Sequence, residues 1–580
     1  MILRGLPIAL LIAASSSAAL AHGGQYRPPD GGSGGGLPPE ALPDPRVPEP
    51  TPPDRGTMTP WERWWDANRF RFLDLRSRIR MRDARGGATA LTAEDREPSD
   101  GPAAPVPPLR AFAEKSILPV VTAALSDADA EVRSAAALAL GKMGFARSLV
   151  DLSRALRDSS RDVRESAVLA LGMLGDPFAV EPLRDILLDP NAEERQRGYA
   201  ALGLGLLGGP EASAALGAFL DPRADAKRSG GIRRRPETTA CVAASLGLAG
   251  GREAAPLLRK IALEGRAPWG GNAETGVRSF ALVGLARMGD RDLLPPADVL
   301  PLLAEDREPI RQGACISLGL LAKPGDDALL KALEVAALGD RDRNTRALAA
   351  MALARVGGET ARAALVRLAD RCGRVDVPFA ALAAGVAGAK EAAPGLLKRF
   401  REEKDPATRG AVAIGLGLLR AKEAAQDLRV VAFTGGARPL RIHAITALGL
   451  MEDAASAGPL RELVQTHPDH ILRGAASVAL GLLGDPDAIP LLEGAAKGAS
   501  TLFARGHACR WLGVIGDRGS GRVLLAIAKD RREIPFLRMF AVTGLGCLAE
   551  EADPPRLAPL GFDLDPEIRN DALDEVAGYM

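Results

Sequence analysis

The sequence predicts an all-α fold, a right-handed α-solenoid (superhelix) built from about fourteen stacked helical hairpins. Hydrophobic residues make up 47% of the 580 residues but aromatic residues only 4%, a balance that favours thin, closely packed helices over thick sheets. The chain is also longer than one hydrophobic core normally organises. Small residues and arginines recur at a fixed spacing over residues 109–580. Such a period is typical of stacked supersecondary units.

The repeat is defined by a small residue, the anchor, in the second helix of each unit. Successive anchors are 31–35 residues apart except for two spacings of 42 and 39 residues. The anchors are Gly141, Gly172, Gly205, Gly247, Ala286, Gly319, Ala354, Gly385, Gly417, Gly449, Gly481, Gly513 and Gly546. An arginine stands eight residues before most anchors, and Arg569 opens a truncated last unit. This regularity predicts a ladder of structural pairs with acidic residues or carbonyls of adjacent turns, rather than a phosphate site.

Residues 469–500 show how one unit is built. Asp469 is placed to cap a helix that runs to Leu483, because an aspartate accepts hydrogen bonds from free N–H groups. Gly484 ends this helix in the left-handed conformation, and Pro490 fits the first turn of the next helix. Helices of 10–14 residues separated by short turns must be antiparallel neighbours. Asp129, Asp342, Asp405 and Asp565 repeat the capping position.

The stretch Asp162-Val163-Arg164 to Gly175-Asp176 resembles HEAT repeats of the phycobilin-lyase-like class, and the resemblance covers about residues 110–580. It implies a superhelix with a concave binding surface. Two enzyme families share the repeat, phycobilin lyases and deoxyhypusine hydroxylase, and they supply the alternative function. The hydroxylase holds iron with His-Glu dipeptides, whereas none of the five histidines here is followed by Glu. Phycobilin lyases act inside the cell, which a leader sequence contradicts.

The first 108 residues predict export and a segmented N-terminal region. Residues 1–21 are expected to form a signal peptide with a short apolar core, cleaved after Ala21. Residues 22–57 are rich in Gly and Pro and predict a disordered tether, and residues 86–108 a second linker. The leader, the tether and the tryptophan segment together resemble secreted bacterial HEAT-repeat proteins of uncharacterised function. We therefore expect a periplasmic or extracellular protein.

Residues 58–85 form a short helical segment rich in Trp and Arg. The residues of interest are Trp61, Trp64, Trp65, Arg69 and Phe72, of which Trp61, Trp65 and Phe72 fall near one helical face. One alternative is a helix that docks onto the solenoid and caps its first repeat. The other is an element that contacts a partner or, through residues 61–85, a membrane surface.

The two long spacings predict loop insertions, about residues 221–236 and 264–276. The first insertion carries arginines, and the second carries a tryptophan that we expect to be exposed. Equivalent turns of neighbouring repeats emerge on the same edge of a solenoid, so the two insertions should lie side by side. Loops held by a rigid frame concentrate binding residues, and Trp with Arg is enriched at interface hot spots. The candidate binding residues are Arg223, Arg228, Arg233, Arg234, Arg235 and Trp269. The alternative is a tolerated insertion without a role.

No motif predicts a catalytic site or a cofactor. His467 and His470 flank a capping aspartate, and His22 would become the mature amino terminus, so these three are weak metal candidates with structural explanations. The formal net charge is +1, which gives no global field to attract nucleic acid. The sequence therefore predicts an exported, non-enzymatic scaffold that binds a protein or peptide.

Overall fold

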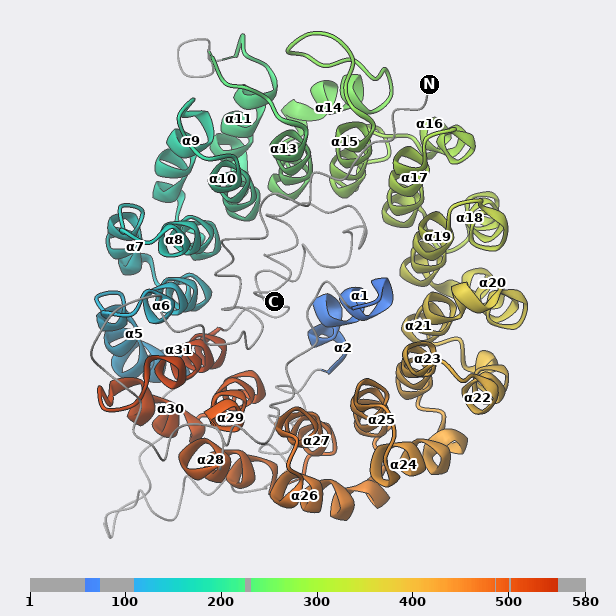
Figure 1. The fold of residues 1–580 in the computed structure, drawn as a ribbon. Coiled ribbons are helices and arrows are strands. Elements are labelled where there is room, and N and C mark those ends of the chain that lie inside the picture. The colour runs from blue at the N-terminus through green and yellow to red at the C-terminus, as the bar shows by residue number, and fades with distance from the viewer. Residues whose placement is uncertain (1–57, 74–108, 225–230, 486, 500–501, 551–580) are drawn as a thin grey trace, which may run out of the picture.

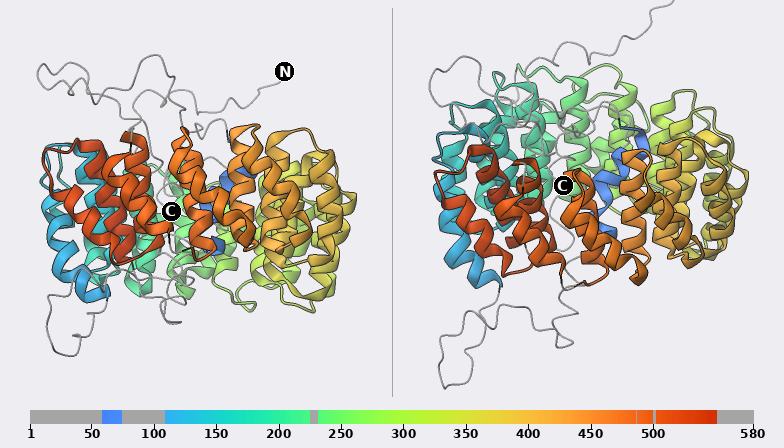
Figure 2. Two further views of the ribbon diagram at one scale, coloured as in Figure 1. Left: turned by 90° about the horizontal axis from the view of Figure 1, so that it is seen from below. Right: turned by 60° about the horizontal axis from the view of Figure 1, so that its bottom comes forward.

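The computed structural model describes residues 58–73, 109–224, 231–485, 487–499 and 502–550, and these residues form helices that alternate between an inner and an outer layer of a ring (Figures 1 and 2). The inner helices are α6 (Ala130–Met143), α8 (Arg161–Leu174), α10 (Glu194–Leu207), α13 (Pro236–Ala249), α15 (Thr275–Arg287), α17 (Glu308–Leu321), α19 (Arg343–Val356), α21 (Val377–Ala387), α23 (Pro406–Leu419), α25 (Arg438–Leu450), α27 (His470–Leu482), α29 (Leu502–Ile515) and α31 (Pro535–Ala549). Each predicted anchor lies on one of them. The predicted all-α repeat fold is thus confirmed.

The outer layer is shorter and less regular. It consists of α4 (Leu109–Phe112), η6 (Ala113–Ile117), α5 (Leu118–Ala124), α7 (Leu149–Ala155), α9 (Val180–Leu188), α11 (Gly209–Leu220), α14 (Ala255–Ala262), α16 (Pro296–Val299), η10 (Leu300–Ala304), α18 (Asp327–Gly339), α20 (Gly358–Arg371), α22 (Ala393–Glu402), α24 (Ala425–Thr434), α26 (Ala457–Thr466), α28 (Ala488–Gly498) and α30 (Ser520–Lys529). Single 3₁₀ turns precede many of these helices. Within the described ranges, no helix is long and apolar enough to cross a membrane.

The repeats close on themselves, because α31 packs against α6 (Figure 1). Gly546 of α31 lies so close to Ala139 of α6 that an added Cβ atom would stand 2.6 Å from the alanine Cβ. The Arg518 guanidinium lies 5.2 Å from the ring centre of Phe112 across the same seam. A stack of about fourteen hairpins is expected to form an elongated arc, and that expectation is wrong: the hairpins complete a turn with so little rise that the last inner helix meets the first.

The small anchors allow this tight curvature. A Cβ atom on Gly141 would stand 2.7 Å from the Cα of Ala170, and one on Gly513 would stand 2.2 Å from the carbonyl oxygen of Gly544. Any larger side chain would force adjacent inner helices apart. The backbones of the inner layer therefore touch while the bulkier outer layer fans out, which curves the stack toward its inner face.

The arginine column forms the structural ladder that the sequence predicts. Arg133 donates to both carboxylate oxygens of Asp158 in the next unit, at 2.8 and 2.9 Å, and to the carbonyl oxygen of Asp127 at 2.9 Å. Arg311 pairs with Asp340 at 2.9 Å in the same way. Arg538 pairs with Asp127, so the last rung joins the end of the ring to its beginning. Four predicted capping aspartates, Asp129, Asp342, Asp405 and Asp469, each accept a hydrogen bond from the first turn of an inner helix; Asp565 lies outside the described residues.

Candidate interaction surface inside the ring

The helices α1 (Pro60–Asn68) and α2 (Phe70–Leu73) form a small unit with its own local stabilisation. Thr59 and Glu62 form a capping box at the start of α1, with the Thr59 amide donating to the Glu62 carboxylate at 2.8 Å. Pro60 occupies the first position, where its missing N–H costs nothing. The chain turns at Arg69, so that Phe72 stacks on Trp65 with ring centres 6.0 Å apart. The predicted helix therefore breaks after Asn68.

This unit lies inside the ring, against its inner wall (Figure 1). Trp61 packs on the imidazole of His443 in α25, with ring centres 4.8 Å apart. Gly410 of α23 makes room for both rings: a Cβ atom there would stand 2.6 Å from His443 Nδ1 and 3.3 Å from Trp61. The exposed fraction of Trp61 is only 2%. A glycine, an imidazole and an indole thus form a fitted notch for one end of α1.

The other end of α1 approaches a position where the pattern of small residues on the inner helices is interrupted. At the position two residues before the anchor, α29 carries Trp511 where most inner helices carry Ala, Gly or Ser. Trp511 leans toward Gly474 of α27, whose missing side chain leaves space for the indole. Arg69 lies over the Trp511 ring at 5.9 Å and forms an ion pair with Asp66 at 2.8 Å. This cation–π contact fixes the second end of the unit.

Besides these contacts, the inner helices α25 to α31 carry several aromatic and imidazole rings. His443, His507 and Phe540 stand six residues before their anchors, so they face the same side of their helices. His470 and His507 lie 5.2 Å apart between ring centres, and Phe536 and Phe540 lie 4.9 Å apart. We define the luminal aromatic band as His443, His470, Phe503, His507, Trp511, Phe536 and Phe540.

The imidazoles of this band are held neutral. Burial, followed by the positive charge of Arg69, lowers the pKa of His443 from 6.5 to about 3. Burial, followed by His470 and Arg510, lowers the pKa of His507 to about 3, and burial also lowers the pKa of His470. His443 Nδ1, His470 Nε2 and His507 Nε2 are buried without a hydrogen-bond partner. The band therefore contains unsatisfied polar atoms inside an apolar surface.

One equivalent position on the far side of the ring is charged instead. Glu165 of α8 takes the position of Gly410 and Gly474, seven residues before the anchor. It accepts hydrogen bonds from Arg161 at 2.9 Å and from Arg195 at 2.8 Å. The inner wall thus carries a charged network at this position on α8, whereas the Gly410 position on α23 is open to the Trp61 ring.

The tryptophan segment docks onto the solenoid, which is one of the two alternatives considered from the sequence. Trp61, Trp64 and Trp65 are buried, and Arg69 and Phe72 are half-buried. The expected place of docking was wrong, since the unit lies against α23, α25 and α29 rather than on the first repeat. Contact of these tryptophans with a membrane requires that α1 leave the ring. Residues 74–85 of the segment lie outside the described residues.

The candidate loop residues have diverse surroundings. Arg223 and Arg233 are exposed, Arg235 lies 3.6 Å from Glu194, and Arg228 lies outside the described residues. Arg234 instead turns inward: it donates to the carbonyl oxygen of Phe219 at 2.5 Å and lies 5.4 Å from the centre of its ring.

Trp269 is half-buried, whereas the sequence had suggested an exposed side chain. It stands in a small hairpin closed by a bridge between Arg266 and Asn272, and it packs partly against the core. A binding role for these loops stays a prediction.

The weak metal candidates are engaged locally. His467 Nδ1 accepts a hydrogen bond from the Asp469 amide at 3.0 Å, and His470 packs against Phe503 with ring centres 5.7 Å apart. Among the described residues, no group of three or more His, Cys, Asp or Glu side chains could hold a metal ion. His22 lies outside the described residues.

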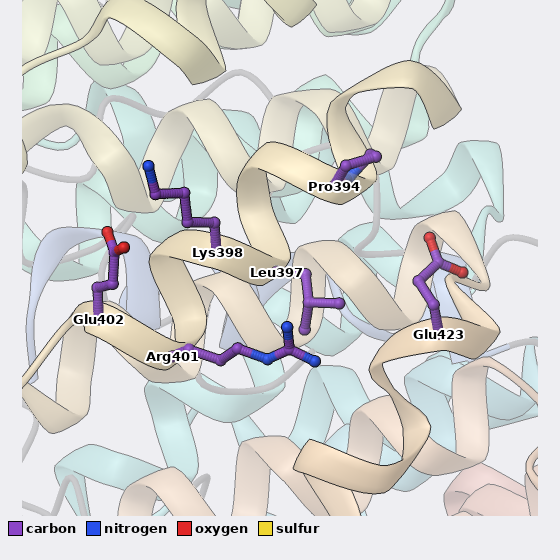
Figure 3. A pocket seen from close by; sticks show the side chains of 6 residues that line it. All are labelled: Pro394, Leu397, Lys398, Arg401, Glu402 and Glu423. Atoms are coloured by element: carbon purple, nitrogen blue, oxygen red, sulfur yellow. The ribbon is translucent and has the colours of Figure 1, made fainter.

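A shallow depression of about 440 Å³ lies on the outer layer between α22 and α24 (Figure 3). Its charged lining residues, Lys398, Arg401, Glu402 and Glu423, are exposed. Arg401 is engaged by Asp427 at 2.9 Å. Because its charged residues are solvated and the depression is shallow, it lacks the enclosed character of a typical ligand site.

Comparison with known proteins agrees with the repeat architecture. The family of HEAT repeats matches residues 117–203, 151–232 and 431–502. No curated protein matches the sequence. Among solved structures, the complex of CpcE and CpcF of phycocyanin lyase from Nostoc sp. PCC7120 is 23% identical, with a TM-score of 0.30, over 47% of this chain and 97% of that chain. Human deoxyhypusine hydroxylase in complex with glycerol is 20% identical, with a TM-score of 0.23, over 53% and 96%.

Proposed function

Because this chain is a HEAT-repeat protein, we propose that it is an exported, non-enzymatic scaffold that binds a protein or peptide on the inner face of its ring. The leader at residues 1–21 supports export to the periplasm or the cell exterior. The observation that carries the proposal is the seat of α1. The ring already holds one short helix on its inner wall, through the His443 notch and the Trp511 contact.

The inner wall has the physical properties of a helix-binding surface. Helix-in-groove recognition uses a rigid apolar surface that receives a few aromatic or aliphatic anchors spaced along one helical face. The luminal aromatic band provides such a surface, and the ladder of arginine pairs keeps it rigid. Closure of the ring removes the frayed end that an open solenoid presents. The inner face is therefore a better candidate than the outer depression.

A photo-crosslinking experiment tests this function. A benzophenone amino acid replaces Phe379, a half-buried residue that stands six residues before the α21 anchor, in the full chain expressed in its native host. The matched control carries the same group at Val430 on the outer helix α24, which is 48% exposed. We expect the Phe379 variant to capture a protein in the envelope or secreted fraction and the Val430 variant not to. Capture from neither position, or equally from both, contradicts an inner-face scaffold.

A further inference from the structure

We propose that the seat of α1 is an exchangeable site, which a partner occupies with an amphipathic helix carrying tryptophan and, about two turns later, arginine. This inference rests on the proposed function and specifies its partner. In the resting protein, α1 acts as a tethered occupant of the site. Three independent features of the structure lead to it.

The first feature is the chemistry of the seat. The Gly410–His443 notch accepts one indole, and the Trp511 face accepts one guanidinium. The groups that fill them, Trp61 and Arg69, are eight residues apart, which corresponds to about 12 Å along a helix. The two positions therefore define a spacing that a partner helix can match. Trp64 and Trp65 also contact Phe72 within the α1–α2 unit, so they help to stabilise the occupant itself.

The second feature is that α1 is an imperfect occupant. Nδ1 of His443, the histidine that Trp61 covers, remains buried without a hydrogen bond while α1 is in place. A buried polar atom without a partner destabilises the state that contains it. A helix that placed a hydroxyl or amide group against His443 Nδ1 would bind the notch better than α1 does. An unsatisfied imidazole in the notch thus favours replacement of the resident helix.

The third feature is that α1 can leave without disrupting the ring. It belongs to no repeat, and its capping box and its Phe72 stack lie within the unit itself. Thirty-five residues separate Leu73 from Leu109, where the outer layer begins. A chain of that length spans up to about 120 Å when extended. A connection of that length is long enough for α1 to leave the wall, and because it keeps α1 attached to the ring, a partner must compete with α1 for the seat.

The test uses a fluorescent synthetic peptide of residues 58–73 and the full-length chain. We expect weak binding to the wild type, because tethered α1 competes, and at least tenfold tighter binding to Trp61→Ala. Adding Gly410→Leu to Trp61→Ala fills the notch and should abolish binding. Adding Gly458→Leu instead should change nothing, because Gly458 is exposed and has no neighbour within 4 Å. Circular dichroism checks that each variant is folded.

A second form of the chain keeps Trp61 intact. A protease site inserted between residues 74 and 108 is cleaved after purification, which leaves α1 held only by its contacts. We expect excess peptide to displace the fragment. If the fragment resists displacement at millimolar peptide, or if the peptide binds all variants equally, the proposal that α1 is exchangeable is overturned. Stable wild-type dimers that dissociate on peptide addition would identify the occupant as α1 of a second copy and overturn a separate partner. Failure here, combined with successful capture from Phe379, would leave the inner-face scaffold standing.

Discussion

Acidification should release α1 from the ring. His443 and His507 are neutral in the seat, with the pKa of each lowered to about 3, and Arg69 lies close enough to oppose protonation of both. Around His443, only Asp66 of α1 favours the charged form; around His507, His470 and Arg510 oppose it. When α1 leaves, the imidazole of His443, which Trp61 covers, regains water and its pKa returns toward 6.5. The released state therefore binds more protons, so the docked state loses stability as the pH falls below 6.5 toward 3.

The size of the effect follows from these values. Between pH 7 and pH 5, a histidine whose pKa moves from 6.5 to about 3 on docking costs about 2 kcal/mol. That cost shifts the docking equilibrium toward release about thirtyfold.

Tryptophan emission measures the release directly, because three of the five tryptophans, Trp61, Trp64 and Trp65, lie on α1. We expect a red shift between pH 7 and pH 5 in the wild type. In the His443→Gln/His507→Gln variant the midpoint should move to lower pH.

His467→Gln is the matched control. Its imidazole contacts the Asp469 amide and Arg441, outside the luminal aromatic band, so it should behave as the wild type does. An emission maximum that does not move in the wild type, or a double variant with an unchanged midpoint, would refute the reasoning.

Three further predictions concern the ring and its maturation. Gly546→Ala should lower the free energy of unfolding by about 1–3 kcal/mol, because the new Cβ atom meets Ala139. Gly217→Ala on α11 has no neighbour within 4 Å and should raise it by about 0.5–1 kcal/mol. Calorimetry that ranks the two variants the other way would show that the closing seam is misplaced. Arg538→Gln should lower the free energy of unfolding by about 2 kcal/mol, because it leaves Asp127 without its ion pair. Scanning calorimetry should show no such loss for a variant that removes a solvent-exposed ion pair. N-terminal sequencing of exported protein should begin at His22; an intact Met1 would contradict cleavage.

The repeat was predictable because its determinants are local. Each anchor reports a close helix contact, each capping aspartate a helix start, and each arginine a pair with a neighbouring turn, as Arg133 with Asp158 shows. Closure was not predictable in the same way. Closure depends on the small rotation between successive units, which many packing details determine. These rotations must add up to a full turn around the ring.

In the candidate site, too, the local part was predictable from the sequence and the long-range part was not. The tryptophans of residues 61–65 marked an unusual segment, and their burial follows from their size and apolar character. Their seat depends on Gly410, His443 and Trp511, which lie about 350 to 450 residues away in sequence and come close only once the ring is formed. One signal could have pointed there: Trp511 interrupts a column that is otherwise mostly Ala, Gly and Ser.

The most direct test of the account is to map what Trp61 touches. A benzophenone amino acid at position 61 of the full chain, followed by irradiation, digestion and mass spectrometry, identifies its neighbours. The account predicts intramolecular links to α23 and α25, near Gly410 and His443, that disappear when excess peptide of residues 58–73 is added. Links to α6, α8 or α10, or to the outer layer alone, would contradict a tryptophan helix seated on the luminal aromatic band.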